Sequence, residues 1–175
     1  LNRLSELVDG ILLRSTAGER DDVFKESFDL VELLRGAADR HHLQAEKPVF
    51  IRLPDVDSFQ VFSSRFHLNT IVDNLLQNAV RYSGEEGVHI DIRLERKEGG
   101  FFLAIADDGW GIAPEDRRRI FEKFYRSSDK DRNYTVKGLG IGLYHVRQCM
   151  EALGGTVRVR DNRPRGTVVE VEVGG

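Results

Sequence analysis

The chain has 175 residues, a length that suits one domain or one domain with a short appendage. Hydrophobic residues make up 40% and charged residues 31%, as in a folded globule, and the formal net charge of -3 argues against a dedicated nucleic-acid binder. The single cysteine, Cys149, excludes an internal disulfide and a multi-cysteine metal cluster, and no apolar run reaches the ~18 residues that cross a bilayer.

The first segment is predicted to be a helix outside the main domain. Apolar residues between positions 1 and 12 recur at helical spacing and form one stripe, whereas residues 16–22 are polar and suit a linker. We therefore expect residues 1–16 to end a helix of a dimerising hairpin and residues 17–27 to form a linker and first strand. An ordinary first helix of the domain is the alternative. Because the chain opens with Leu1, we also expect it to be a fragment of a longer protein.

Predicted strands and helices alternate along the rest of the chain. Apolar alternation bounded by turn residues predicts strands at 23–28, 49–53, 60–62, 88–96, 102–106, 156–160 and 167–173. Apolar residues at helical spacing predict helices at 29–42, 65–82 and 139–153. Pro114 is expected to open a further short helix. The order predicts an α/β two-layer sandwich, in which a mixed sheet of about five strands carries three helices on one face, preceded by the helical stub.

Two amides share one face of the predicted helix 65–82. Asn74 and Asn78 are four residues apart, so they lie one turn apart and outside the apolar stripe. Amide oxygens suit Mg²⁺, which takes many of its ligands from water and substrate phosphates, and Arg81 is placed where it could reach such phosphates. Taken alone, the pair is explained more simply as solvent-facing helix surface.

Two segments contain closely spaced glycines, one after a predicted strand and one at the start of a predicted helix. The segment Asp107-Asp108-Gly109-Trp110-Gly111-Ile112 lets the backbone approach a flat ligand, and its first carboxylate can accept a hydrogen bond from an exocyclic amine such as that of adenine. The segment from Lys137 to Leu143 opens a helix with exposed backbone N–H groups, which suits phosphate. Each segment alone is equally compatible with an ordinary loop.

The stretch 115–137 between these segments offers little to bury. It holds eight basic and five acidic side chains, and its polar second half is expected to be mobile. A basic mobile flap would suit a polyphosphate, although a solvated loop has the same composition.

In this order and spacing, the segments resemble the nucleotide-binding boxes of sensor histidine kinases. Residues 74–83 (NLLQNAVRYS) resemble the N box, residues 107–112 the first glycine box, residues 121–126 (FEKFYR) the F box and residues 138–143 the second glycine box. Gly154-Gly155 and Gly166-Thr167 also fall where that family has them. The resemblance runs from about Phe28 to Val173, and it implies the GHKL ATP-binding fold, with residues 28–175 as the catalytic domain and 115–137 as its ATP lid.

The resemblance implies a role for each matching residue. Asn78 and Asn74 match the Mg²⁺-binding asparagines, and Asn78 and Arg81 are the expected catalytic pair. Asp107 matches the carboxylate that recognises the adenine amine. The remaining expected ATP-binding residues are Tyr82, Gly109, Gly111, Ile112, Phe121, Phe124, Lys137, Gly138, Leu139, Gly140, Gly142, Leu143 and Thr167.

The resemblance also implies chemistry and partners. The γ-phosphoryl group of ATP would pass to a histidine on the dimerisation and phosphoacceptor domain of the parent chain, and from there to an aspartate of a response-regulator receiver domain. We expect the parent to be a homodimer, with this domain on the cytoplasmic side of a membrane-anchored sensor, and we expect no nucleic-acid partner.

The accepting histidine is not expected in this chain. The family places an acidic residue directly after that histidine, and none of the five histidines here has one. Two other functions remain open, namely a GHKL serine kinase of the anti-sigma type and an ATP-gated module like the MutL proteins or the ninety-kilodalton heat-shock chaperones. A degenerate module that binds without catalysis is disfavoured by the intact Asn78 and Asp107.

Overall fold

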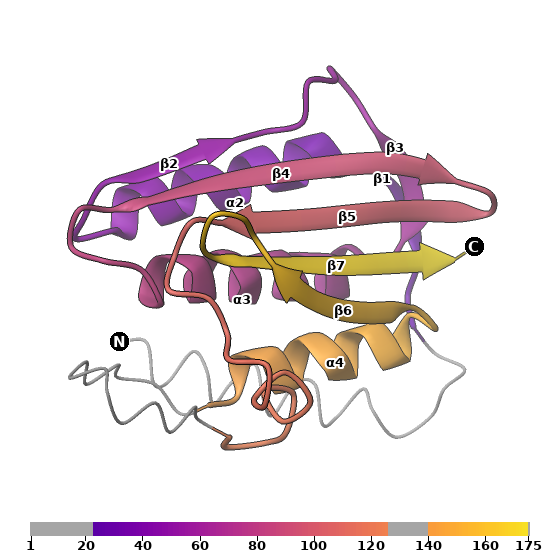
Figure 1. Ribbon diagram of the computed structural model, residues 1–175. Coiled ribbons are helices and arrows are strands. Elements are labelled where there is room, and N and C mark those ends of the chain that lie inside the picture. Colours follow the sequence, from indigo (N-terminus) through magenta and orange to yellow (C-terminus); the bar gives the residue numbers. More distant parts are fainter. Residues whose placement is uncertain (1–22, 126–139, 175) are drawn as a thin grey trace.

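A five-stranded mixed sheet forms one layer of the molecule (Figure 1). The computed structural model describes residues 23–125 and 140–174, so the expected helical stub and the second half of the expected lid lie outside it. The strand order is β2 (Val49–Arg52), β4 (Val88–Lys97), β5 (Gly100–Asp107), β7 (Thr167–Gly174) and β6 (Thr156–Asp161). Only β2 and β4 pair in parallel, which makes the sheet mixed as predicted.

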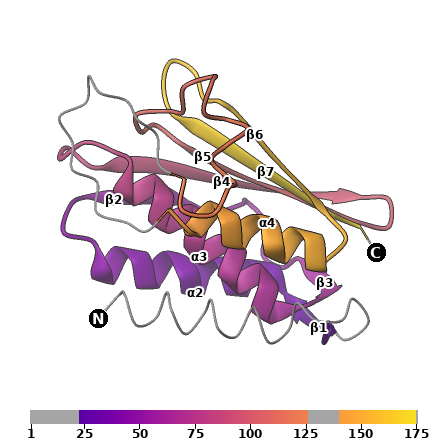
Figure 2. The same cartoon turned by 90° about the horizontal axis from the view of Figure 1, so that it is seen from below.

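Three helices cover one face of this sheet, as expected. They are α2 (Leu30–Gln44), α3 (Arg65–Arg81) and α4 (Gly142–Ala152), and Figure 2 shows α3 lying between the other two. Asp29 caps α2 by accepting a hydrogen bond from the Val31 N–H group at 2.9 Å. The core between the layers contains Leu34, Leu76 and Leu103, each fully buried.

The first predicted strand does not join the main sheet. It is observed as β1 (Glu26–Asp29), which pairs antiparallel with β3 (Gln60–Ser63) in a separate two-stranded sheet. Arg65, at the start of α3, reaches back to this small sheet and lies 3.4 Å from the Glu26 carboxylate. The small sheet therefore joins the start of the described chain to the start of α3.

The prediction of a short helix that begins at Pro114 is wrong. Residues 114–121 form successive turns, in which the Asp116 N–H group bonds to the Ala113 carbonyl and the Asp116 carbonyl accepts from Arg119 and Ile120. The Tyr125 hydroxyl donates to Asp116 Oδ1 at 2.5 Å, and Phe124 has a left-handed φ of 64°. These contacts fold the segment back on itself, which prevents a regular helix. The helix predicted at 139–153 is observed from Gly142.

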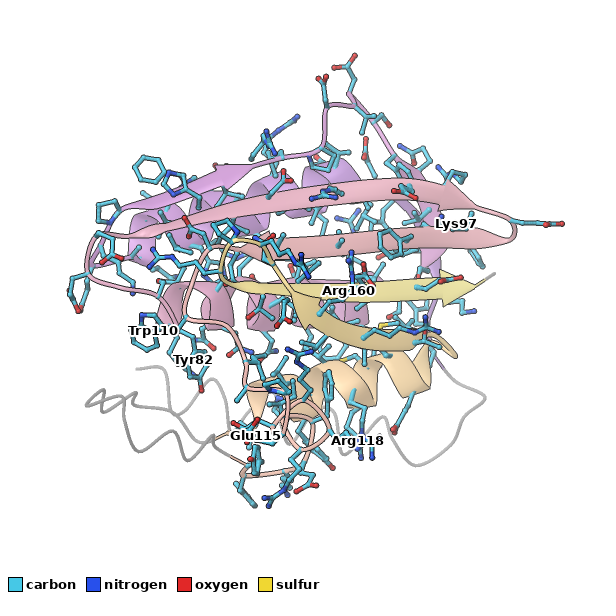
Figure 3. The ribbon with its side chains drawn as sticks, viewed as in Figure 1. Tyr82, Lys97, Trp110, Glu115, Arg118 and Arg160 are labelled. Carbon is cyan, nitrogen blue, oxygen red and sulfur yellow. The ribbon has the colours of Figure 1, made fainter. Side chains whose placement is uncertain are left out.

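The other face of the sheet carries charged side chains. Arg52 Nε lies 2.7 Å from the Asp91 carboxylate, and Arg160 on β6 pairs with Glu170 on β7 (Figure 3). Among the described residues, no helix is long and apolar enough to cross a membrane.

Candidate functional site

Asn74 and Asn78 of α3 face the first residue of α4. Asn74 Nδ2 donates to the Thr70 carbonyl one turn earlier at 2.8 Å, which commits the amide nitrogen and leaves Oδ1 as an acceptor. A Cβ at Gly142 would lie 2.9 Å from Asn74 Oδ1 and 3.6 Å from Asn78 Oδ1. Both asparagines are half-buried. Two amide oxygens and the N-terminus of a helix therefore meet at one place, and glycine provides the space between them.

The N-terminus of α4 is joined to the expected F box. The Phe124 N–H group donates to the Gly140 carbonyl at 2.9 Å, just before α4 begins. Among the described residues, no side chain caps the N-terminus of this helix. Uncapped N–H groups at a helix N-terminus attract anions such as phosphates. The place where the amide oxygens converge can thus receive both a cation and an anion.

A carboxylate ends the neighbouring central strand, β5. Asp107 Oδ1 accepts hydrogen bonds from the Gly109 N–H group at 2.9 Å and from the Thr167 N–H group at 3.2 Å. Among the described residues, these bonds use one oxygen and leave Oδ2 to accept from a ligand. The carboxylate is thus oriented by backbone on two sides, which suits recognition of a single donor group.

Burial sets the protonation of this carboxylate. Desolvation raises the pKa of Asp107 to about 6, and the nearby charge of Asp108 adds to the increase. The hydrogen bonds from Gly109 and Thr167 act in the opposite direction but do not cancel it. Asp107 therefore titrates closer to neutral pH than an exposed aspartate does.

The end of α3 connects the amide pair to the strand-end acid. The Tyr82 carbonyl accepts a hydrogen bond from the Trp110 N–H group at 2.9 Å, and Figure 3 shows both side chains at this end of the helix. The Lys47 ammonium group donates to the next carbonyl, that of Ser83, at 2.8 Å. The helix that carries Asn74 and Asn78 is thus fastened to the loop that follows Asp107.

The expected site residues fall into two linked groups. Asn74, Asn78 and Gly142 form one, and Asp107, Gly109 and Thr167 form the other. Gly111 lies against the backbone of Gly166, and Leu143 packs on the main core. Arg81, Ile112 and Phe121 are half-buried near these groups in sequence, whereas Tyr82 and Phe124 are exposed. Lys137, Gly138 and Leu139 lie outside the described residues, so their expected roles stay predictions.

The sequence did not single out Lys47 or Asn162. Lys47 lies between α2 and β2, and Asn162, in the turn between β6 and β7, donates through Nδ2 to the Asp107 carbonyl at 2.8 Å. Nothing in the local pattern indicates either contact, because each joins residues more than thirty positions apart. An asparagine opening a hairpin turn reads simply as a turn residue.

Comparison with known proteins gives a family match. The profile described as "Histidine kinase-, DNA gyrase B-, and HSP90-like ATPase" matches residues 64–174. The chain is 39% identical over 121 residues to the sensor protein CiaH of Streptococcus pneumoniae serotype 4, a match that covers 64% of this chain and 27% of CiaH. The chain thus spans about a quarter of the length of that relative.

Solved structures show the same fold. The mycobacterial sensor histidine kinase MprB superimposes with a TM-score of 0.72 and 28% identity, over 87% of this chain and 98% of that one. Full-length ShkA in complex with AMPPNP superimposes with a TM-score of 0.78 and 28% identity, over 98% of this chain and 35% of that one. The predicted α/β fold is confirmed by these similarities.

Proposed function

The chain belongs to the histidine kinase-, DNA gyrase B- and HSP90-like ATPase family, and we propose that it is the domain that holds Mg-ATP in a two-component sensor histidine kinase. The observation that carries this proposal is the junction between α3 and the end of β5. There, an oriented carboxylate and two amide oxygens are held by elements that contact each other through Tyr82 and Trp110.

We propose that Asp107 selects the base. Its free oxygen, Oδ2, can accept a hydrogen bond from the exocyclic amine of adenine, whereas the carbonyl at the same position of guanine would repel it. The base pocket is assigned to four further residues, which either contact this carboxylate or follow it closely in the sequence: Gly109, Gly111, Ile112 and Thr167. The AMPPNP bound to the similar ShkA supports an adenine nucleotide as the ligand.

We propose that Asn74 and Asn78 hold Mg²⁺. Hard cations prefer oxygen ligands, and the amide oxygens of these residues face the N-terminus of α4, where phosphates would be received. No cluster of three histidine, cysteine or acidic side chains among the described residues offers an alternative metal site. When bound, ATP would supply the phosphoryl group and Mg²⁺ would neutralise the charge on it.

The residues of this chain would then position the nucleotide rather than attack it. We assign Arg81 and Tyr82 to the phosphates and the base, and residues 138–143 to the phosphates. Phe121 and Phe124 are assigned to the lid that borders the phosphates. The accepting histidine would lie on the dimerisation domain of the parent chain, and the final acceptor would be an aspartate of a receiver domain. An anti-sigma-type serine kinase is the second candidate, but both CiaH and MprB carry names of sensor proteins.

Calorimetric titration with ADP, in the presence and absence of Mg²⁺, tests the nucleotide site. We expect Mg²⁺ to tighten ADP binding in the wild-type protein and Asn78→Ala to abolish most of that gain. Because the variant lacks one metal ligand, its affinity for ADP in the presence of Mg²⁺ should be about tenfold lower than that of the wild-type protein. Gln44→Ala, at the exposed end of α2, is the matched control and should retain the gain. The absence of binding heat with either ADP or ATP would refute the proposal.

The parent protein tests the acceptor. Labelled phosphate from ATP should appear on a site that is labile in acid and stable in base, as expected of phosphohistidine. An acid-stable label would favour the serine kinase instead.

A further inference from the structure

The hairpin formed by β6 and β7 donates hydrogen bonds to both the side chain and the main chain of Asp107. The pairing of β5 with β7 stops at Ala106 and Val168, so the ladder gives Asp107 no partner on the β7 side. Two other bonds take its place: the Thr167 N–H group donates to Asp107 Oδ1 at 3.2 Å, and Asn162 Nδ2 donates to the Asp107 carbonyl at 2.8 Å. The β6–β7 hairpin thus contacts both parts of Asp107, its carboxylate through the first residue of β7 and its main chain through the turn residue Asn162.

The turn is itself closed and lies against the end of the strand. The Asn162 N–H group donates to the Gly166 carbonyl at 3.0 Å, which fixes the base of the turn. A Cβ at Gly166 would overlap the Asp107 carbonyl, so the two backbones approach each other too closely for a side chain at this position. Asn162 is half-buried, and its side chain is the one that bridges this contact.

We propose that Asn162 is a positioning residue that makes the site selective for adenine, by holding the backbone from which the Asp107 carboxylate projects. This inference rests on the proposed function of Asp107 and goes beyond it, because it assigns base selectivity to a residue of another hairpin. Selection by one hydrogen bond depends on the direction of the acceptor, since such bonds weaken steeply when they bend. Asp107 is held by hydrogen bonds to Oδ1 and to its main-chain carbonyl. With both held, Oδ2 can point in one direction only.

A purely local role for Asn162 makes a different prediction. Asparagine and aspartate both favour turns, so Asn162→Asp would preserve a turn-forming role. It would, however, remove the N–H group that donates a hydrogen bond to the Asp107 carbonyl. Asn162→Ala removes the donor without adding a charge. Arg165→Gln is the matched control in the same turn, because the one contact that the Arg165 side chain makes among residues 23–125 and 140–174 is exposed, at 3.4 Å from Glu86.

The test is the ratio of the ADP and GDP dissociation constants, measured by calorimetry below the unfolding temperature of every variant. We expect Asn162→Asp and Asn162→Ala each to weaken ADP binding about fivefold, which is the loss expected for one hydrogen bond. Neither substitution should change GDP binding. Arg165→Gln should keep the wild-type ratio.

An unchanged ratio in either variant would overturn the inference, even if thermal stability fell, because Asn162 would then be structural only. Failure of both variants to fold would overturn it for the same reason. A wild-type protein that binds neither nucleotide would instead refute the proposed function, and the inference with it.

Discussion

At the residue scale, Asp107 combines a defined orientation with an unusual protonation. Its raised pKa means that the folded protein keeps a proton that an unfolded chain would release between about pH 4 and pH 6. The contribution of this residue to folding stability is therefore present at low pH and is lost as the pH rises through about 6. Recognition of a donor group requires the opposite form, since only the ionised carboxylate accepts at both oxygens.

The affinity for ADP should consequently fall as the pH is lowered through about 6. With half of the carboxylate protonated near that pH, we expect binding at pH 5 to be about tenfold weaker than at pH 7, in proportion to the ionised fraction. Calorimetry on the wild-type protein and on Asp107→Asn measures this. The variant reports the titration of the phosphates alone, so parallel pH profiles for the two proteins would contradict the prediction.

At the scale of single elements, the meeting of α3 and α4 depends on the absence of a side chain at Gly142. Gly142→Ala would place a methyl group against Asn74 Oδ1 and displace that amide. Gly142 is the first residue of α4, so alanine gains there only part of the ~1 kcal/mol by which it exceeds glycine in a helix interior. We therefore expect thermal stability to change little and Mg-ADP affinity to fall severalfold.

A second helical glycine provides the control for this experiment. Gly36 lies within α2, and an added Cβ would approach only Arg40, at 3.6 Å. Gly36→Ala should raise stability without changing nucleotide affinity. Equal effects of the two substitutions on binding would show that the space at Gly142 has no role in the site.

Much of the element pattern could be predicted from local spacing. The apolar repeat located α3 to within a residue, because a helix buried on one side must place apolar residues three and four positions apart. The same repeat cannot specify strand partners, so the sequence did not indicate that β1 pairs with β3 outside the main sheet. At Pro114 helix-starting chemistry was present, but the segment forms successive turns in which the Tyr125 hydroxyl donates to the Asp116 carboxylate, a contact that the local pattern does not indicate.

The candidate site divides in the same way. Asn74, Asn78 and Asp107 were recognisable because each stands in a motif within a few residues. Asn162 and Lys47 were not, since their contacts cross 55 and 36 positions of the chain. Local patterns thus indicate ligand-contacting groups, whereas the groups that orient them become visible only in the folded structure.

At the scale of the whole molecule, stability should depend on the layer between the sheet and the helices. Leu76 is fully buried there, whereas Leu43 at the end of α2 is 87% exposed. We expect Leu76→Ala to lower the free energy of unfolding by about 2–5 kcal/mol and Leu43→Ala to change it by less than about 0.5 kcal/mol. Urea denaturation of both variants measures the difference, and similar midpoints would contradict the assigned core.

The small sheet of β1 and β3 lies at the end of α3 that is remote from the candidate nucleotide site. Its contact with Arg65 lies at the first turn of α3, whereas Tyr82, at the opposite end, contacts Trp110. Seventeen helical residues separate the two ends by roughly 25 Å. The start of the described chain and the loop after Asp107 therefore contact opposite ends of one helix, so a displacement of α3 along its axis would move both.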